Sequence, residues 1–257
     1  MATSAQIRSQ IEAALADRIP RALTFKNHQE QEVISCGFNE VDRLRAFPRG
    51  ALVELCGPAS SGRTTLLHGL LANVTSRGEA AAFLDPTDRF DPVSAKQNGA
   101  VLRNLLWIRS GPPKPHKRGQ LGPLDQMLTG ADLILQSGGF GLVVLDFIDI
   151  PPKMARTIPL TAWFGMRRAV ENTRTLLIAL TQEPNTGSSA SVTVRLEHAG
   201  LELALTEDRV STLKHVEGDC LVQSIGTRVE VLRARQRKPS LSVHHAANFS
   251  TTLQGYG

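Results

Sequence analysis

The stretch GPASSGRTT, residues 57–65, has the spacing of a phosphate-binding loop, Gly-x-x-x-x-Gly-Lys-[Ser/Thr], with Arg63 in place of the lysine. The apolar run 51–56 before it predicts a buried strand, and residues 64–76 after it have helical periodicity. Gly57 and Gly62 allow backbone turns that a Cβ atom would obstruct. Backbone N–H groups and the following helix start attract phosphate, and Thr64 is placed to contact its magnesium ion. A serine-rich turn that binds nothing remains an alternative, because Arg63 replaces the lysine.

The composition is that of a globular protein. The 257 residues are 41% apolar and 21% charged, with a net charge of +5, which fits one large α/β domain or two small ones and permits nucleic-acid binding without requiring it. No apolar run approaches the roughly 20 residues that span a bilayer, and residues 1–23 lack the features of a secretory signal. Cys36, Cys56 and Cys220 lie far apart, which fits neither a disulfide framework nor a zinc site. We therefore expect a cytoplasmic protein with no membrane partner.

Strands and helices alternate along most of the chain, which is typical of a parallel sheet. Residues 3–23 predict a helix with an apolar stripe, and the polar stretch 26–32 follows it. Further strands are predicted at 80–85, 105–108, 141–147 and 175–182, and further helices at 91–104, 123–137 and 160–173. After Gly187 the pattern predicts successive antiparallel strands at 191–198, 211–222, 227–235 and 241–247. We expect a helix and linker at 1–32 and an α/β core domain at 33–257.

Residues 34–67, which contain the loop, resemble the core of RecA-type recombinases. The resemblance continues in order and spacing through 82–99, 141–147, 175–183, 191–197 and 227–238, and so covers about 34–247. It implies a RecA-like P-loop core, in which helices flank a mostly parallel, twisted sheet that antiparallel strands extend towards the C-terminus. The segment FPRGALVEL (47–55) and the absence of an extra C-terminal DNA-binding domain are closer to ImuA-like proteins, RecA-fold accessory factors of bacterial SOS mutagenesis.

The resemblance implies that ATP and Mg2+ occupy the loop. Asp146 matches a family carboxylate that orients magnesium through water, and Gln182 matches a glutamine that senses the terminal phosphate. From the residues alone, an aspartate that only caps a strand end remains an alternative. The implied nucleotide contacts are Gly57, Pro58, Ala59, Ser60, Ser61, Gly62, Arg63, Thr64, Thr65, Asp146 and Gln182, with Thr64 and Asp146 at the magnesium ion.

Two positions depart from the family pattern. Arg63 can bond phosphate, but its planar fork cannot lie where a compact ammonium lies. Thr87 replaces the glutamate that activates water, and a hydroxyl does not accept that proton near neutral pH. Asp85 or Asp88 as a substitute base remains an alternative. We therefore expect nucleotide binding with a degenerate hydrolysis site, and we assign no catalytic residue.

Basic residues suggest contacts with a neighbouring subunit and with DNA. Arg233 and Arg235 match residues that recombinases insert into the adjacent nucleotide site. The family binds DNA through two loops, here 147–159 with Lys153 and Arg156, and 183–191 without a basic residue. Arg237 and Lys238 add positive charge near the C-terminus, and 114–118 is a second basic stretch. Phosphate contacts need only positive charge within reach, so solvated basic surface remains an alternative throughout.

These observations predict a RecA-like protein of DNA repair or SOS mutagenesis that acts through protein contacts. The expected partners are a RecA-type recombinase or a second copy, bound by the N-terminal helix, an error-prone polymerase subunit, and DNA. An active DNA-dependent ATPase that forms recombinase filaments is the first alternative. A SulA-like regulator of cell division is the second.

Overall fold

The computed structural model describes residues 32–109, 122–205, 220–234 and 246–252, all of which belong to one compact unit, Glu32–Gly257. The helix predicted over 3–23 lies outside the described residues. The same is true of the basic stretch 114–118 and of Arg235, Arg237 and Lys238.

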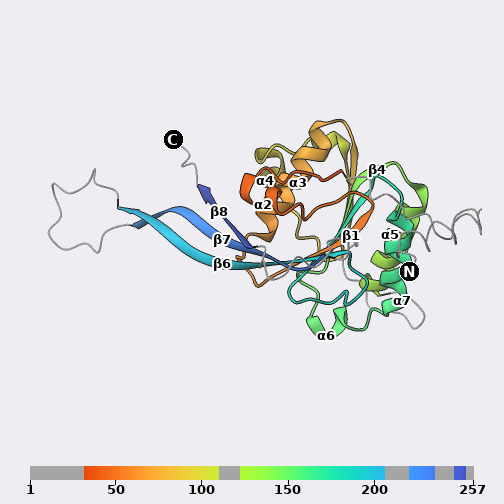
Figure 1. The fold of residues 1–257 in the computed structure, drawn as a ribbon. Helices are drawn as coiled ribbons and strands as arrows, with labels where there is room; N and C mark the ends of the chain where they lie inside the picture. Colours follow the sequence, from red (N-terminus) through yellow and green to blue (C-terminus); the bar gives the residue numbers. More distant parts are fainter. Residues whose placement is uncertain (1–31, 110–121, 206–219, 235–245, 253–257) are drawn as a thin grey trace, which may run out of the picture. The chain divides into compact units, whose positions relative to one another are not determined.

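The described residues form an eight-stranded sheet in the order β3-β2-β4-β5-β1-β6-β7-β8 (Figure 1). The first six strands in this order run parallel to one another. β7 pairs antiparallel with β6 on one edge and with β8 on the other. This arrangement confirms the predicted RecA-like α/β fold. The strands are β1 (Ala51–Cys56), β2 (Ala80–Asp85), β3 (Leu105–Arg109), β4 (Phe140–Asp146), β5 (Leu176–Thr181), β6 (Val192–Leu205), β7 (Cys220–Ala234) and β8 (Ala246–Thr252).

The antiparallel pairing predicted after Gly187 is confirmed, because β6 pairs antiparallel with β7, and β7 with β8. The strands predicted at 211–222 and 227–235 are not separate in the described residues, because β7 runs unbroken from Cys220 to Ala234. The other edge of β6 pairs in parallel with β1, from Val53 to Cys56. A strand can serve both neighbours because each edge carries its own hydrogen-bonding groups. Beyond this pairing with β1, β6 and β7 continue together, and β8 pairs with β7 from Ser224 to Glu230 (Figure 1).

Helices cover both faces of the sheet. They are α2 (Asn39–Arg43), α3 (Arg63–Ser76), α4 (Pro92–Gln97), the short 3-10 helix η1 (Leu102–Asn104), α5 (Pro123–Ser137), α6 (Pro152–Ala155) and α7 (Leu160–Val170). The helix predicted over 91–104 is interrupted because Gly99 has a φ of 95°. The helix predicted over 160–173 ends at Val170 because Asn172 also has positive φ, at 67°. The segment 147–159, expected as a loop, contains α6.

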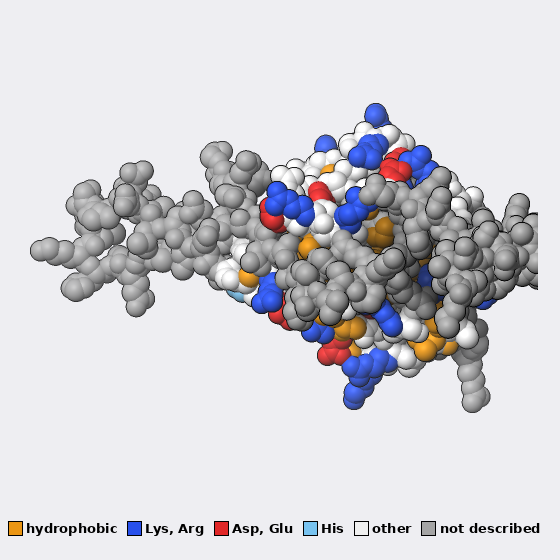
Figure 2. All heavy atoms as spheres, in the orientation of Figure 1, with side chains coloured by type: hydrophobic (Ala, Val, Ile, Leu, Met, Phe, Trp, Pro, Cys, Tyr) orange, Lys and Arg blue, Asp and Glu red, His pale blue; other side chains and the backbone are white. Residues whose placement is uncertain are grey.

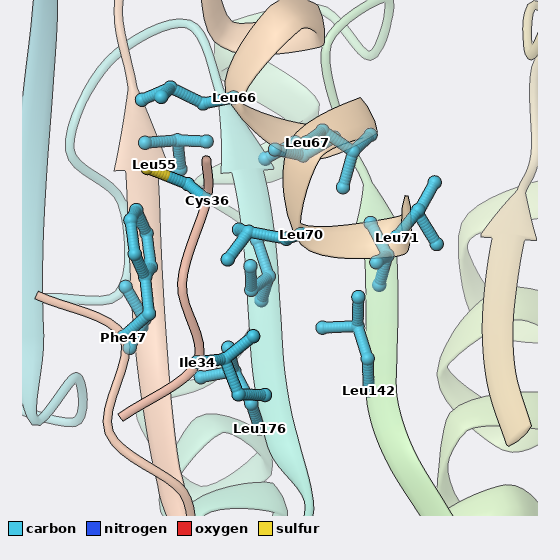
Figure 3. Packing of buried hydrophobic residues seen from close by; sticks show 14 of the residues in the cluster. Ile34, Cys36, Phe47, Leu55, Leu66, Leu67, Leu70, Leu71, Leu142 and Leu176 are labelled. Carbon is cyan, nitrogen blue, oxygen red and sulfur yellow. The ribbon is translucent and has the colours of Figure 1, made fainter. Parts of the chain in front are cut away.

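An apolar core lies on each face of the sheet. On one face α2, α3 and α4 pack with Ile34, Cys36 and Phe47 against the alternate residues of the central strands. Figure 3 shows the leucines of α3 directed at the sheet, beside Leu55, Leu142 and Leu176. On the other face α5, α6 and α7 bury Trp163 and its neighbours. The central parallel strands are therefore buried on both sides, which explains why they read as continuous apolar runs.

Two helical glycines should respond in opposite ways to the same substitution. A Cβ on Gly69 of α3 would meet the backbone O of Cys36 at 1.9 Å, whereas nothing lies within 4 Å of a Cβ on Gly165 of α7. We expect Gly69→Ala to lower the free energy of unfolding by about 1–3 kcal/mol through overpacking. Gly165→Ala should raise it by about 0.5–1 kcal/mol through helix propensity. Denaturant unfolding measures both, and an equal response would contradict the packing of α3 on residue 36.

Candidate nucleotide site

The loop 57–62 leaves β1 through a gap that admits only glycine. A Cβ on Gly57 would meet the backbone O of Leu196 at 2.4 Å and Ser61 Oγ at 2.7 Å. The N–H of Gly57 donates to the carbonyl of Thr181 at 3.3 Å. The start of the loop is thus held between β5 and β6, the strands on either side of β1.

The loop geometry fits an anion. Ser60 and Gly62 have positive φ, at 58° and 86°, so the backbone turns sharply before α3. No side chain caps the first turn of α3, which leaves backbone N–H groups for a ligand. The hydroxyl of Ser61 is buried and has no hydrogen-bond partner among the described residues. A phosphate oxygen would satisfy these donors.

Arg63 points to the end of β5. Its side chain is buried, and Nη1 donates to the carbonyl of Thr181 at 2.6 Å. Burial lowers the pKa of this guanidinium, and the carboxylate of Asp146 opposes that shift. A phosphate contact by Arg63 stays a prediction, and other N–H groups of the guanidinium would make it while Nη1 bonds the Thr181 carbonyl.

A cleft of about 1200 Å3 opens beside the loop. Thr64 and Thr65 from the start of α3 and Asp146 from the end of β4 line it together, as their expected roles require. Asp146 is buried and accepts the N–H of Ile148 at 2.8 Å. Burial raises the pKa of this carboxyl to about 6, and Asp85 and Asp149 contribute to that shift. A buried carboxylate beside a threonine hydroxyl offers the oxygen ligands that Mg2+ prefers.

Gln182 lies outside the lining of this cleft. Its Nε2 donates to the carbonyl of Ile148 at 2.5 Å. This bond joins the segment after β5 to the segment after β4. Ile148 itself lines the cleft. Gln182 therefore touches the nucleotide cleft through Ile148, and its expected contact with the terminal phosphate stays a prediction.

Thr87 and its acidic neighbours are occupied elsewhere. Asp85 is buried and accepts hydrogen bonds from the N–H and hydroxyl of Thr87, the N–H of Phe90 and Nε1 of Trp107. Asp88 pairs with Arg109 at 3.3 Å on the surface. None of Asp85, Thr87 and Asp88 lines the cleft. The structure thus gives no support to Asp85 or Asp88 as a substitute base.

The segments after β4 and β5 contact each other. Arg156 pairs with Glu183 at 2.6 Å, and Asn185 Nδ2 donates to the carbonyl of Ala155 at 2.8 Å. Lys153 is exposed on α6. Arg233 donates to the carbonyl of Gly187 at 2.7 Å, so this side chain holds the second loop within its own subunit. Among the described residues that Figure 2 leaves uncovered, basic and acidic side chains are interspersed.

The sequence prediction missed most of the residues that line the cleft, among them Arg89, Asp149 and His68. Arg89 and Asp149 form an ion pair at 3.4 Å, and His68 comes from α3. Burial lowers the pKa of His68, which favours its neutral form. Helical spacing could have found His68, because it follows Thr64 by one turn. No local pattern joins Arg89 to Asp149. The described residues contain no cluster of three or more metal-ligating side chains and no helix long and apolar enough to cross a membrane.

Comparison with known proteins identifies relatives over part of the chain. The family model for the RecA N-terminal domain matches residues 5–155. The chain is 34% identical over 110 residues to Protein RecA of Borrelia duttonii (strain Ly), 43% of this chain and 27% of that one. It is 30% identical over 143 residues to Protein RecA of Rickettsia massiliae (strain Mtu5), 54% of this chain and 38% of that one. The matches therefore span about a third of the length of these relatives.

Replacement of Asp146 should separate stability from ligand binding. Its carboxyl holds a proton in the folded protein between its ordinary pKa of 3.8 and about 6, so the stability of the ligand-free protein falls as the pH rises through that window. Asp146→Asn should therefore raise the free energy of unfolding near neutral pH, by up to about 3 kcal/mol. The gain should vanish in acid. Chemical denaturation without Mg2+ measures it, and the exposed control Asp132→Asn should change little. A loss of stability would contradict the burial of a charged Asp146.

Proposed function

The chain belongs to the RecA N-terminal domain family, and from that premise we propose that it binds ATP with Mg2+ in a site that hydrolyses it slowly. We further propose that it works in DNA repair, as an ImuA-like accessory protein of damage-induced mutagenesis. The observation that carries the nucleotide proposal is the cleft, where Thr64 and Thr65 of the uncapped helix start and the buried Asp146 line a common space. The unpartnered hydroxyl of Ser61 lies in the loop just before that helix.

The residues divide the ligand between them. Backbone N–H groups of the loop and the hydroxyl of Ser61 would hold the phosphates. Thr64 and Asp146 would hold the magnesium ion, which neutralises charge on the phosphates when it is bound. Because Nη1 of Arg63 donates to Thr181, its guanidinium would meet the outer phosphates from a different position than a lysine ammonium. Misplacement of a catalytic cation by about 1 Å lowers rates by roughly 100-fold, which supports slow turnover.

The contacts of the loops after β4 and β5 support an accessory role better than they support strand exchange. Recombinases use the loops after β4 and β5 for DNA, whereas here Arg156 is paired with Glu183 and the second loop has no basic residue. Arg233 is held by Gly187 within its own subunit, which removes it from the contact with a neighbouring nucleotide site. The proposed partners are therefore a RecA-type recombinase or a second copy, together with an error-prone polymerase subunit. DNA contact by Lys153, Arg237 and Lys238 remains part of the proposal.

ATP affinity should depend on the hydroxyl of Thr64. Thr64 is exposed in the cleft, so Thr64→Ala should leave the melting temperature unchanged and weaken Mg2+-dependent ATP binding about tenfold, or 1.4 kcal/mol. Thr161→Ala, an exposed threonine at the start of α7, is the matched control and should bind as the wild type. Steady-state phosphate release should be slow with and without single-stranded DNA. Robust DNA-stimulated release by the wild type would instead favour an active recombinase.

The N-terminal segment should carry association. Its apolar stripe, Ile7, Ile11, Leu15 and Ile19, needs a surface to bury it, because an isolated helix of this length is marginal in water. Deletion of residues 1–24 should keep the melting temperature nearly unchanged and abolish self-association, or binding to a purified RecA-type recombinase, in sedimentation experiments. A large fall in melting temperature with association intact would place the stripe on the chain's own core.

A further inference from the structure

An ion pair between Arg89 and Asp149 lines the candidate nucleotide cleft. Arg89 follows β2 and Asp149 follows β4, and these strands are neighbours in the sheet, so their carboxyl ends bring the two residues together. Arg89 Nε lies 3.4 Å from Asp149 Oδ2, and both side chains line the same cleft as Thr64 and Asp146. The side chains are 72% and 42% exposed. An exposed pair of this kind contributes little to stability, so a ligand can separate it at low cost.

Asp149 is the carboxylate of the cleft that has no other task among the described residues. Asp91 caps α4, where it accepts the N–H of Val93 and the hydroxyl of Ser94. Asp146 is buried beside Thr64, where the magnesium ion would bind. Among the described residues Asp149 forms an ion pair with Arg89, and it lies close enough to Arg63 and Asp146 to influence their pKa values. A carboxylate that is exposed to the cleft and weakly paired can receive a proton from water.

We propose that Arg89 and Asp149 are the hydrolytic pair of this site, acting within one subunit. This proposal rests on the ATP binding proposed above. On binding, the guanidinium of Arg89 leaves Asp149 for the terminal phosphate, where it offsets the developing negative charge as an arginine finger does. The freed carboxylate of Asp149 orients the attacking water. The pair thereby activates water, which the hydroxyl of Thr87 cannot do.

The proposed step balances without any further reactant. Asp149 accepts one proton from the water whose oxygen bonds to the terminal phosphorus, and the bond from that phosphorus to the bridging oxygen breaks. The electron pair of that bond leaves with ADP, and Asp149 returns its proton to solvent. Nothing is oxidised or reduced. Because both residues belong to one chain, specific activity should be independent of protein concentration, unlike that of a site completed by a neighbouring subunit.

The structure offers a matched control pair. Arg109 and Asp88 lie 3.3 Å apart, are comparably exposed, and do not line the cleft. The test variants are Arg89→Gln and Asp149→Asn, and the controls are Arg109→Gln and Asp88→Asn. The full-length protein is used throughout, and melting temperatures should agree among all variants.

The first readout is affinity, which does not depend on turnover. Arg89→Gln should weaken binding of a non-hydrolysable ATP analogue about tenfold and leave ADP affinity within about twofold, because Arg89 meets only the terminal phosphate. Asp149→Asn should bind both nucleotides at least as well as the wild type, because it removes a negative charge. The second readout is single-turnover hydrolysis, which should fall roughly 100-fold or more in both test variants. The controls should match the wild type in both.

The outcomes distinguish failure of this proposal from failure of the proposed ATP binding on which it rests. Failure of the wild type to bind the ATP analogue overturns the proposed function and this proposal with it. Intact binding with unchanged hydrolysis in Asp149→Asn overturns this proposal alone. Three further results would overturn this proposal alone. They are equal losses of ATP-analogue and ADP affinity in Arg89→Gln, no measurable hydrolysis in a wild type that binds, and a specific activity that rises with protein concentration.

Discussion

The carbonyl of Thr181 at the end of β5 is the acceptor on which the site depends. It receives the N–H of Gly57 and Nη1 of Arg63, so it fixes both ends of the phosphate loop to one strand. Gly57 can reach it only because it has no side chain to collide with the backbone of Leu196. Once the loop is held there, α3 must begin at Arg63, and its first turn faces Asp146 across the cleft. Strand order, loop path and cleft are therefore consequences of one close approach between β1, β5 and β6.

Much of this could be predicted from the sequence, because the informative signals are local. The bounds of β1 and β2 were predicted to the residue, since each strand is a short buried run between polar turns. The bounds of α4 and α7 were predicted too long, since positive φ at Gly99 and Asn172 is not visible in a helical pattern. The pairing of Arg89 with Asp149 depended on the order of strands, which no short segment of sequence reveals.

Arg63 shows how a residue that departs from a motif can gain a structural role. As a replacement for the lysine of the phosphate loop it looks like a loss. In the fold its guanidinium is buried and bonds the Thr181 carbonyl, which also accepts the N–H of Gly57. A lysine ammonium is compact and strongly hydrated, whereas the guanidinium fork is planar and more weakly hydrated, which suits a buried bond to a carbonyl. The position therefore contributes to the support of the loop before any nucleotide binds.

Hydrogen bonds from the core also anchor the loops after β4 and β5. Glu54, buried in β1, accepts the N–H groups of Asn185 and Thr186, so the second loop is anchored from within the core. Its outer part is then joined to the first loop by Gln182, Asn185 and Glu183, and to β7 by Arg233. A surface that is ordered before binding loses little conformational entropy when a partner binds. The bonds from Glu54 thus order residues 185 and 186 from within the core before any partner is present.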